Sequence, residues 1–254
     1  MFRDDFMAMA GAASVKSGLL KKNPAGYFLS SMLAGVFVGF GILLIFTIGG
    51  QLSGQPYTKI IMGAAFGIAL SLVIMAGAEL FTGNNLVMAA GSLTGGVKWG
   101  DTAKLWAVCY IGNWLGAALL ALAFFGTGLL SGDTAEFIAS STAVKMSLPP
   151  GELFFRGMLC NALVCLAVWM TFRTKSDAAK LIMVFWCLFA FITTGFEHSI
   201  ANMTLLTAGM LSPAGAAVSM GGYFYNILLS TLGNMAGGIV IVALPYFIIS
   251  RKRD

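Results

Sequence analysis

The side chains most capable of chemistry stand together in one short string, "GFEHSIANM" at residues 195–203. Glu197, His198 and Ser199 are adjacent there, and His198 is the only histidine of the chain. An imidazole can change its charge near neutral pH, so this string could bind or protonate a charged solute. A carboxylate, an imidazole and a hydroxyl could also form the nucleophilic centre of an enzyme.

A second polar string, "GAELFTGNNLVM" at 77–88, matches the first. Glu79 stands 118 residues before Glu197. Asn84 stands the same distance before Asn202. Because a feature present twice indicates a structural task, we expect Glu79 and Glu197 to cap free backbone N–H groups where a helix is interrupted. The histidine has no partner in this repeat, which favours a functional role for it.

The composition indicates the class of protein to which these strings belong. Of 254 residues, 58% are hydrophobic and only 10% are charged, and there are 32 glycines. Soluble domains have about 25% charged residues, so the chain is expected to be a membrane protein with no room for a soluble catalytic or nucleic-acid-binding domain. The four cysteines lie in apolar runs without paired spacing, so we expect free thiols, no metal site and no cofactor.

Long runs without charge place the membrane spans, because about 20 apolar residues cross a bilayer and a charge within it is costly. The second and fifth spans carry the polar strings and are expected to be interrupted, near 80–85 and 196–199. From Ser199 to Met210 a helix would be about 18 Å long, which makes a half-helix rather than a full span. The six predicted spans are 26–50, 59–92, 102–129, 151–172, 180–210 and 222–249.

The basic residues orient these spans. With six spans, 12 of the 15 lysines and arginines fall on one side together with both termini. Lys59, Lys145 and Arg156 fall on the other side. Cytoplasmic loops carry the excess of basic residues, so both termini are predicted to be cytoplasmic, with 1–22 as an amphipathic segment at the membrane surface. Topology explains the net charge of +5 without a nucleic-acid partner.

The two halves of the chain also repeat each other. Each half has three spans, so the second half must be inverted, and a solute path is expected where the halves meet near the midplane. Half-helices aimed inward from opposite sides would direct positive N-terminal ends there, which favours an anion. We therefore predict a single domain, 1–254, with repeats at 23–129 and 151–250. The further matching strings are "SMLAGVFV" at 31–38 with "GMLCNALV" at 157–164, and "GNWLGA" at 112–117 with "GNMAGG" at 233–238.

Three strings, "AELFTGNN", "CNALVCLAVWM" at 160–170 and "GFEHSIANM", resemble the signatures of the formate/nitrite transporter family. Within this family the sequence looks most similar to the nitrite and hydrosulfide channels. The resemblance implies an all-α, aquaporin-like protomer that assembles as a homopentamer in the cytoplasmic membrane. It implies passage of a small monovalent anion, such as nitrite, formate or hydrosulfide, that is either passive or linked to protons.

The same resemblance assigns roles to individual residues. His198 resembles the central pore histidine, and Thr82 resembles the hydroxyl that faces it. Asn161 and Asn202 resemble polar pore-lining residues, and Lys145 resembles the lysine that draws anions into the outer vestibule. The residues that match apolar constrictions are Phe66, Leu70 and Phe191 on the outer side and Leu80 and Val164 on the inner side.

Two other functions fit parts of the pattern. A pore for water or glycerol would use the same inverted half-helices, although no arginine filter is evident at the midplane. An intramembrane enzyme built on Glu197, His198 and Ser199 is disfavoured, because adjacent residues of one helix point in different directions. We therefore expect the protein not to be an enzyme.

Overall fold

The computed structural model describes residues 2–251, and these residues form helices and connecting loops with no strand. Six helical segments are long and apolar enough to cross a bilayer, which confirms the predicted number of spans and makes the chain a multi-pass membrane protein. The six are α2 (Pro24–Gln51), α3 to η1 (Thr58–Gly77), α6 (Trp99–Gly126), α8 (Pro150–Arg173), α9 (Asp177–Thr194) and α11 to α12 (Met220–Ser250). Within the composite spans lie α3 (Thr58–Ala65), α4 (Ile68–Leu72), η1 (Val73–Gly77), α11 (Met220–Ala236), η2 (Gly237–Ala243) and α12 (Leu244–Ser250).

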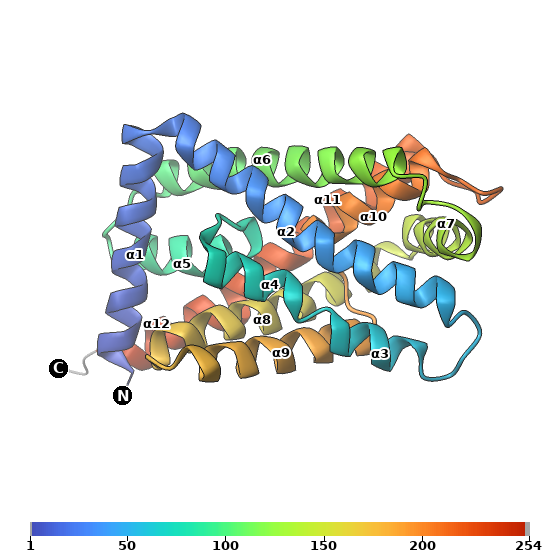
Figure 1. The fold of residues 1–254 in the computed structure, drawn as a ribbon. Coiled ribbons are helices and arrows are strands. Elements are labelled where there is room, and N and C mark those ends of the chain that lie inside the picture. Colours follow the sequence, from blue (N-terminus) through green and yellow to red (C-terminus); the bar gives the residue numbers. More distant parts are fainter. Residues whose placement is uncertain (1, 252–254) are drawn as a thin grey trace.

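Two shorter helices complete the interrupted spans. The helices α5 (Phe81–Leu93) and α10 (Ser199–Leu211) have 13 residues each, or about 20 Å, and start near the middle of the molecule. They extend in opposite directions (Figure 1). Each break begins at a glycine with positive φ, Gly77 and Gly195, which stand 118 residues apart. A side chain would strain that backbone. The first break lies at 78–80, slightly before the predicted 80–85, because Gly77 allows the turn there.

A short helix lies across each end of the bundle. At one end α1 (Arg3–Lys22) packs against α5, and at the other α7 (Gly132–Met146) packs against α10 (Figure 1). The sequence led us to expect an amphipathic segment at 1–22, but α7 was not predicted, because its mixed polar and apolar composition reads as a connection. Of the two end helices, α7 is therefore the one that the sequence did not indicate.

Close helix contacts explain part of the glycine excess. Gly116 of α6 lies against the backbone carbonyl of Met32 in α2. In the second half, Gly237 lies against the carbonyl of Met158 in α8 in the same way. A Cβ atom at either glycine would overlap that carbonyl, so the two pairs of spans can approach only because these residues have no side chain. The same kind of close contact thus joins two spans within each half of the chain.

Candidate functional site

His198 lies at the first turn of α10, where the chain leaves the second break. Its backbone is extended, and its Nδ1 accepts a hydrogen bond from the backbone N–H of Ala201 at 3.1 Å. Its Nε2 lies 3.0 Å from Oγ1 of Thr82, at the start of α5. A neutral imidazole that accepts at Nδ1 carries its hydrogen on Nε2, so the ring donates to Thr82. The structure thus brings together two predicted site residues from opposite breaks.

A small apolar cavity adjoins the imidazole. Its volume is about 10 Å³, enough for about one water molecule. The rings of Phe66 and Phe191 meet edge to face there, with centroids 5.5 Å apart, and Phe191 also stacks on His198 at 5.9 Å. The residues that line the cavity with His198 are Val38, Phe66, Ala69, Leu70, Leu80, Val164, Leu188 and Phe191.

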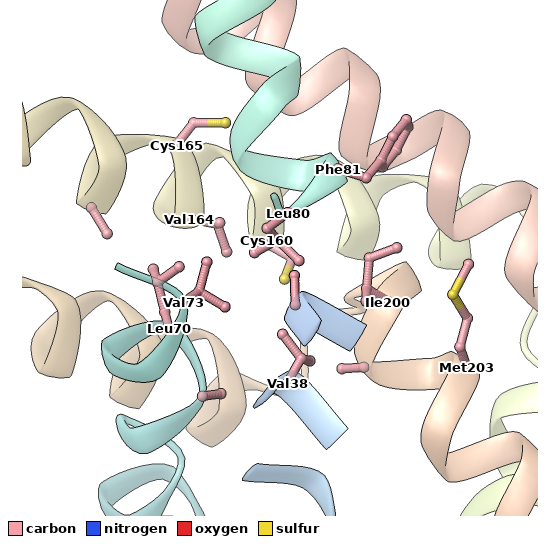
Figure 2. Packing of buried hydrophobic residues seen from close by; sticks show 14 of the residues in the cluster. Val38, Leu70, Val73, Leu80, Phe81, Cys160, Val164, Cys165, Ile200 and Met203 are labelled. Carbon is pink, nitrogen blue, oxygen red and sulfur yellow. The ribbon is translucent and has the colours of Figure 1, made fainter. Parts of the chain in front are cut away.

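All five predicted constriction residues line this one cavity beside His198. Figure 2 shows how four of the lining side chains converge from different elements: Val38 from α2, Leu70 from α4, Leu80 from the first break and Val164 from α8. Phe191 is three residues from the end of α9, which places its ring beside the imidazole. Apolar side chains thus close the path beside His198.

A larger vestibule of about 300 Å³ opens from His198 toward the α7 end. Its lining includes all three basic residues that the topology assigned to the side opposite the termini, Lys59, Lys145 and Arg156. Arg156 pairs with Glu152 at 2.8 Å. Lys59 forms no ion pair within residues 2–251. Sequence reasoning did not single out Lys59, although its place among the three minority basic residues was a usable signal.

Each break carries a carboxylate that binds a lysine from the end helix beside it. Lys145 of α7 lies 2.6 Å from Oε1 of Glu197, and Lys16 of α1 lies at the same distance from Oε1 of Glu79. The other carboxylate oxygen accepts from an asparagine amide, that of Asn202 at 2.7 Å for Glu197. The matching bond from Asn84 to Glu79 is 2.9 Å long. The carboxylates thus bind side chains. The prediction that they cap backbone N–H groups is wrong.

Two other asparagines cap the breaks. Oδ1 of Asn113 accepts from the N–H of Phe81, and Oδ1 of Asn234 accepts from that of Ser199, both at 2.9 Å. The amide nitrogen of each also donates to two carbonyls, Ser31 and Glu79 for Asn113 and Gly157 and Glu197 for Asn234. The repeated strings "GNWLGA" and "GNMAGG" contain these residues, but nothing in the strings marks the asparagines as helix caps.

The two asparagines expected to line the pore have different surroundings. Asn202 lines the vestibule and binds Glu197. Asn161 lies outside the lining of both the vestibule and the central cavity. Its amide nitrogen lies 2.7 Å from the carbonyl of Asn234 and 3.3 Å from that of Thr82. In this structure Asn161 therefore ties α8 to α11 and to the start of α5.

The geometry does not assemble a catalytic serine. Both ring nitrogens of His198 are committed, and Oγ of Ser199 has no hydrogen-bond partner. Glu197 is bound by Lys145 and Asn202. Among residues 2–251 no group of three or more histidine, cysteine or acidic side chains could hold a metal ion, and the four cysteines are free and buried.

Inverted repeats, two broken helices and a central path closed by apolar side chains define a membrane transport protein. The sequence matches the family model described as formate/nitrite transporter over residues 6–248, and the chain belongs to this family. This confirms the resemblance found in the sequence strings. Membership in a transporter family also means that the chain is not an enzyme.

Relatives and solved structures agree with this placement. The chain is 42% identical to the nitrite transporter NirC of Escherichia coli (strain K12), with 100% of this chain and 94% of the relative covered. A solved structure titled FNT family ion channel superposes with a TM-score of 0.92 and 39% identity, covering 98% of this chain and 99% of that one. A pentameric formate channel with formate bound has a TM-score of 0.79 and 29% identity, over 91% and 99% of the two chains.

Proposed function

We propose that this protein is a channel for small monovalent anions such as nitrite or formate, with one path per protomer of a homopentamer in the cytoplasmic membrane and both termini cytoplasmic. The named nitrite and formate relatives support the substrate class, and the pentameric solved structure supports the assembly. The observation that carries the proposal is a vestibule with three basic side chains that leads directly to His198.

Anions enter through the vestibule. Lys59, Lys145 and Arg156 raise the local concentration of anions, and their attraction falls as salt is added. Lys145 is offset by Glu197 and Arg156 by Glu152, so Lys59 contributes the charge that no carboxylate cancels. This net positive mouth selects against cations before any constriction is reached.

The central cavity then forces dehydration. A space of about 10 Å³ cannot hold a hydrated anion, so the path opens only when the contact between Phe66 and Phe191 separates. An aromatic pair contributes about 0.5–1.5 kcal/mol beyond area burial, so this opening is within reach of thermal motion. Removing water from a bare anion costs far more. A hydrogen-bond donor or a proton at the centre must offset that cost.

His198 supplies the polar group at this point. In its neutral form the hydrogen on Nε2 is donated to Thr82, and it becomes available to an anion when the imidazole turns or Thr82 shifts. A second proton would have to sit on Nδ1, where the N–H of Ala201 now donates. Proton-linked passage therefore requires the first turn of α10 to open, whereas passage by hydrogen bonding leaves that turn intact.

The test is uptake into proteoliposomes that contain the purified protein. Nitrite, formate and hydrosulfide are supplied separately at several pH values, and osmotic swelling with glycerol is measured on the same vesicles. We expect uptake of at least one anion to exceed that of protein-free vesicles, with no glycerol swelling. Swelling with glycerol in the absence of anion uptake would contradict the proposal and indicate a neutral-solute pore.

A further inference from the structure

A third cavity, of about 540 Å³, lies where the start of α1, the end of α5 and the end of α12 meet. It shares no lining residue with the vestibule or the central cavity. In Figure 1 the start of α1 and the end of α12 lie at this corner. The cavity is therefore separate from the proposed anion path and sits at the end of the bundle that carries most of the basic residues.

Two arginines, one from each end of the chain, line this cavity. Neither Arg3 nor Arg251 forms an ion pair with another residue in the range 2–251. The guanidinium of Arg251 lies 4.8 Å from the centroid of the Phe247 ring, a cation–π contact that holds the group beside the cavity. Within the described residues no acidic side chain lines the cavity, and nearby Asp5 is already paired with Arg173.

The rest of the lining is largely apolar. Phe6 is buried and packs against Trp169 and Phe247, with ring centroids 6.3 and 6.1 Å away, so this wall is rigid. Ser250 borders the same cavity, and its hydroxyl has no hydrogen-bond partner. Two arginines without an ion pair inside the range 2–251, beside an apolar wall, suit a ligand that has both a strongly anionic group and a hydrocarbon part.

We infer that this cavity binds a phosphate group. The planar fork of a guanidinium matches phosphate oxygens, and two such groups from opposite chain ends can hold one phosphate between them. The bound phosphate would join the start of α1 to the end of α12. The phosphate can come from an anionic phospholipid or from solution, and the apolar wall favours the lipid. The inference does not depend on which anion the channel carries.

Binding is tested with the purified full-length protein in lipid nanodiscs. One set contains phosphatidylcholine alone, one contains phosphatidylcholine with phosphatidylglycerol, and a third contains phosphatidylcholine with inorganic phosphate added to the buffer. The unfolding temperature is measured in each set, and retained phosphatidylglycerol is counted by native mass spectrometry. The variants are R3Q/R251Q and the matched control K22Q/K175Q, which removes two basic residues outside the cavity.

For the wild type and the control we expect phosphatidylglycerol to be retained and to raise the unfolding temperature. In R3Q/R251Q the affinity should fall at least about tenfold, because hydrogen bonds to charged groups contribute about 1.5–3 kcal/mol each. Stabilisation by inorganic phosphate in phosphatidylcholine would identify a soluble ligand instead. The inference would be overturned if wild type, control and R3Q/R251Q retained phosphatidylglycerol equally and gained equally in unfolding temperature. It would also be overturned if the control lost as much affinity as R3Q/R251Q, or if no set of nanodiscs raised the unfolding temperature of the wild type.

Discussion

Replacing Asn234 with alanine tests whether one side chain holds the second break. The amide of Asn234 is buried and makes three hydrogen bonds at 2.7–2.9 Å, to the N–H of Ser199 and the carbonyls of Gly157 and Glu197. Polar contacts between membrane helices average about 0.6 kcal/mol each, and buried hydrogen bonds in proteins reach about 1.5 kcal/mol. N234A should therefore lower the free energy of unfolding by about 2–4.5 kcal/mol.

Equilibrium unfolding in mixed detergent and SDS micelles measures this loss. Asn23 offers a matched control, because its side chain accepts only one bond, from the N–H of Gly26 at the start of α2. N23A should cost about 1 kcal/mol, as other helix caps do. Because Ser199 follows His198, N234A should also slow anion uptake, whereas N23A should not. Equal losses of stability in the two variants would refute the assignment of Asn234 as the cap.

Three further predictions follow from the packing and charge of the path. K59Q should reduce anion uptake several-fold at low salt. The difference from wild type should disappear near 1 M salt, where the Debye length is about 3 Å. A reduction of uptake that does not depend on salt would contradict electrostatic attraction of the anion by Lys59. F66A should widen the central cavity and raise uptake of larger anions, while lowering the free energy of unfolding by about 3–5 kcal/mol; unchanged selectivity would show that the contact with Phe191 is not the barrier. G35A should destabilise the protein, because the new Cβ would overlap the carbonyl of Asn113. G126A, with open space around it, should leave the free energy of unfolding unchanged or raise it by up to about 1 kcal/mol. Similar free energies of unfolding for the two variants would argue against this packing.

The six spans were predictable from sequence, because charges are excluded from hydrocarbon whatever the details of packing. The matching polar strings around Glu79 and Glu197 likewise predicted both breaks to within a few residues. The family's signature strings led to His198 and Thr82, and their separation of 116 residues explains why only the fold could show that they touch.

Other features depend on contacts between helices that no local pattern records. Asn113 and Asn234 are caps because their amides reach backbone atoms on neighbouring elements, so their sequence context resembles that of ordinary packing residues. Lys16 was counted only for topology, yet α1 carries it to Glu79. The α7 helix was not predicted, because it has only 15 residues and no continuous apolar run.

The most direct test of the account is the pH dependence of anion uptake in H198N. Asparagine can still cap α10 through its side-chain oxygen, so the variant should fold and assemble like wild type, which size-exclusion chromatography and its unfolding temperature would verify. We predict that uptake in proteoliposomes falls at least about tenfold, because the imidazole that meets the anion at the centre is gone. The dependence of uptake on pH should flatten, because asparagine cannot take up a proton. Uptake with the rate and pH profile of wild type would show that the anion does not depend on His198, and the central claim would be wrong.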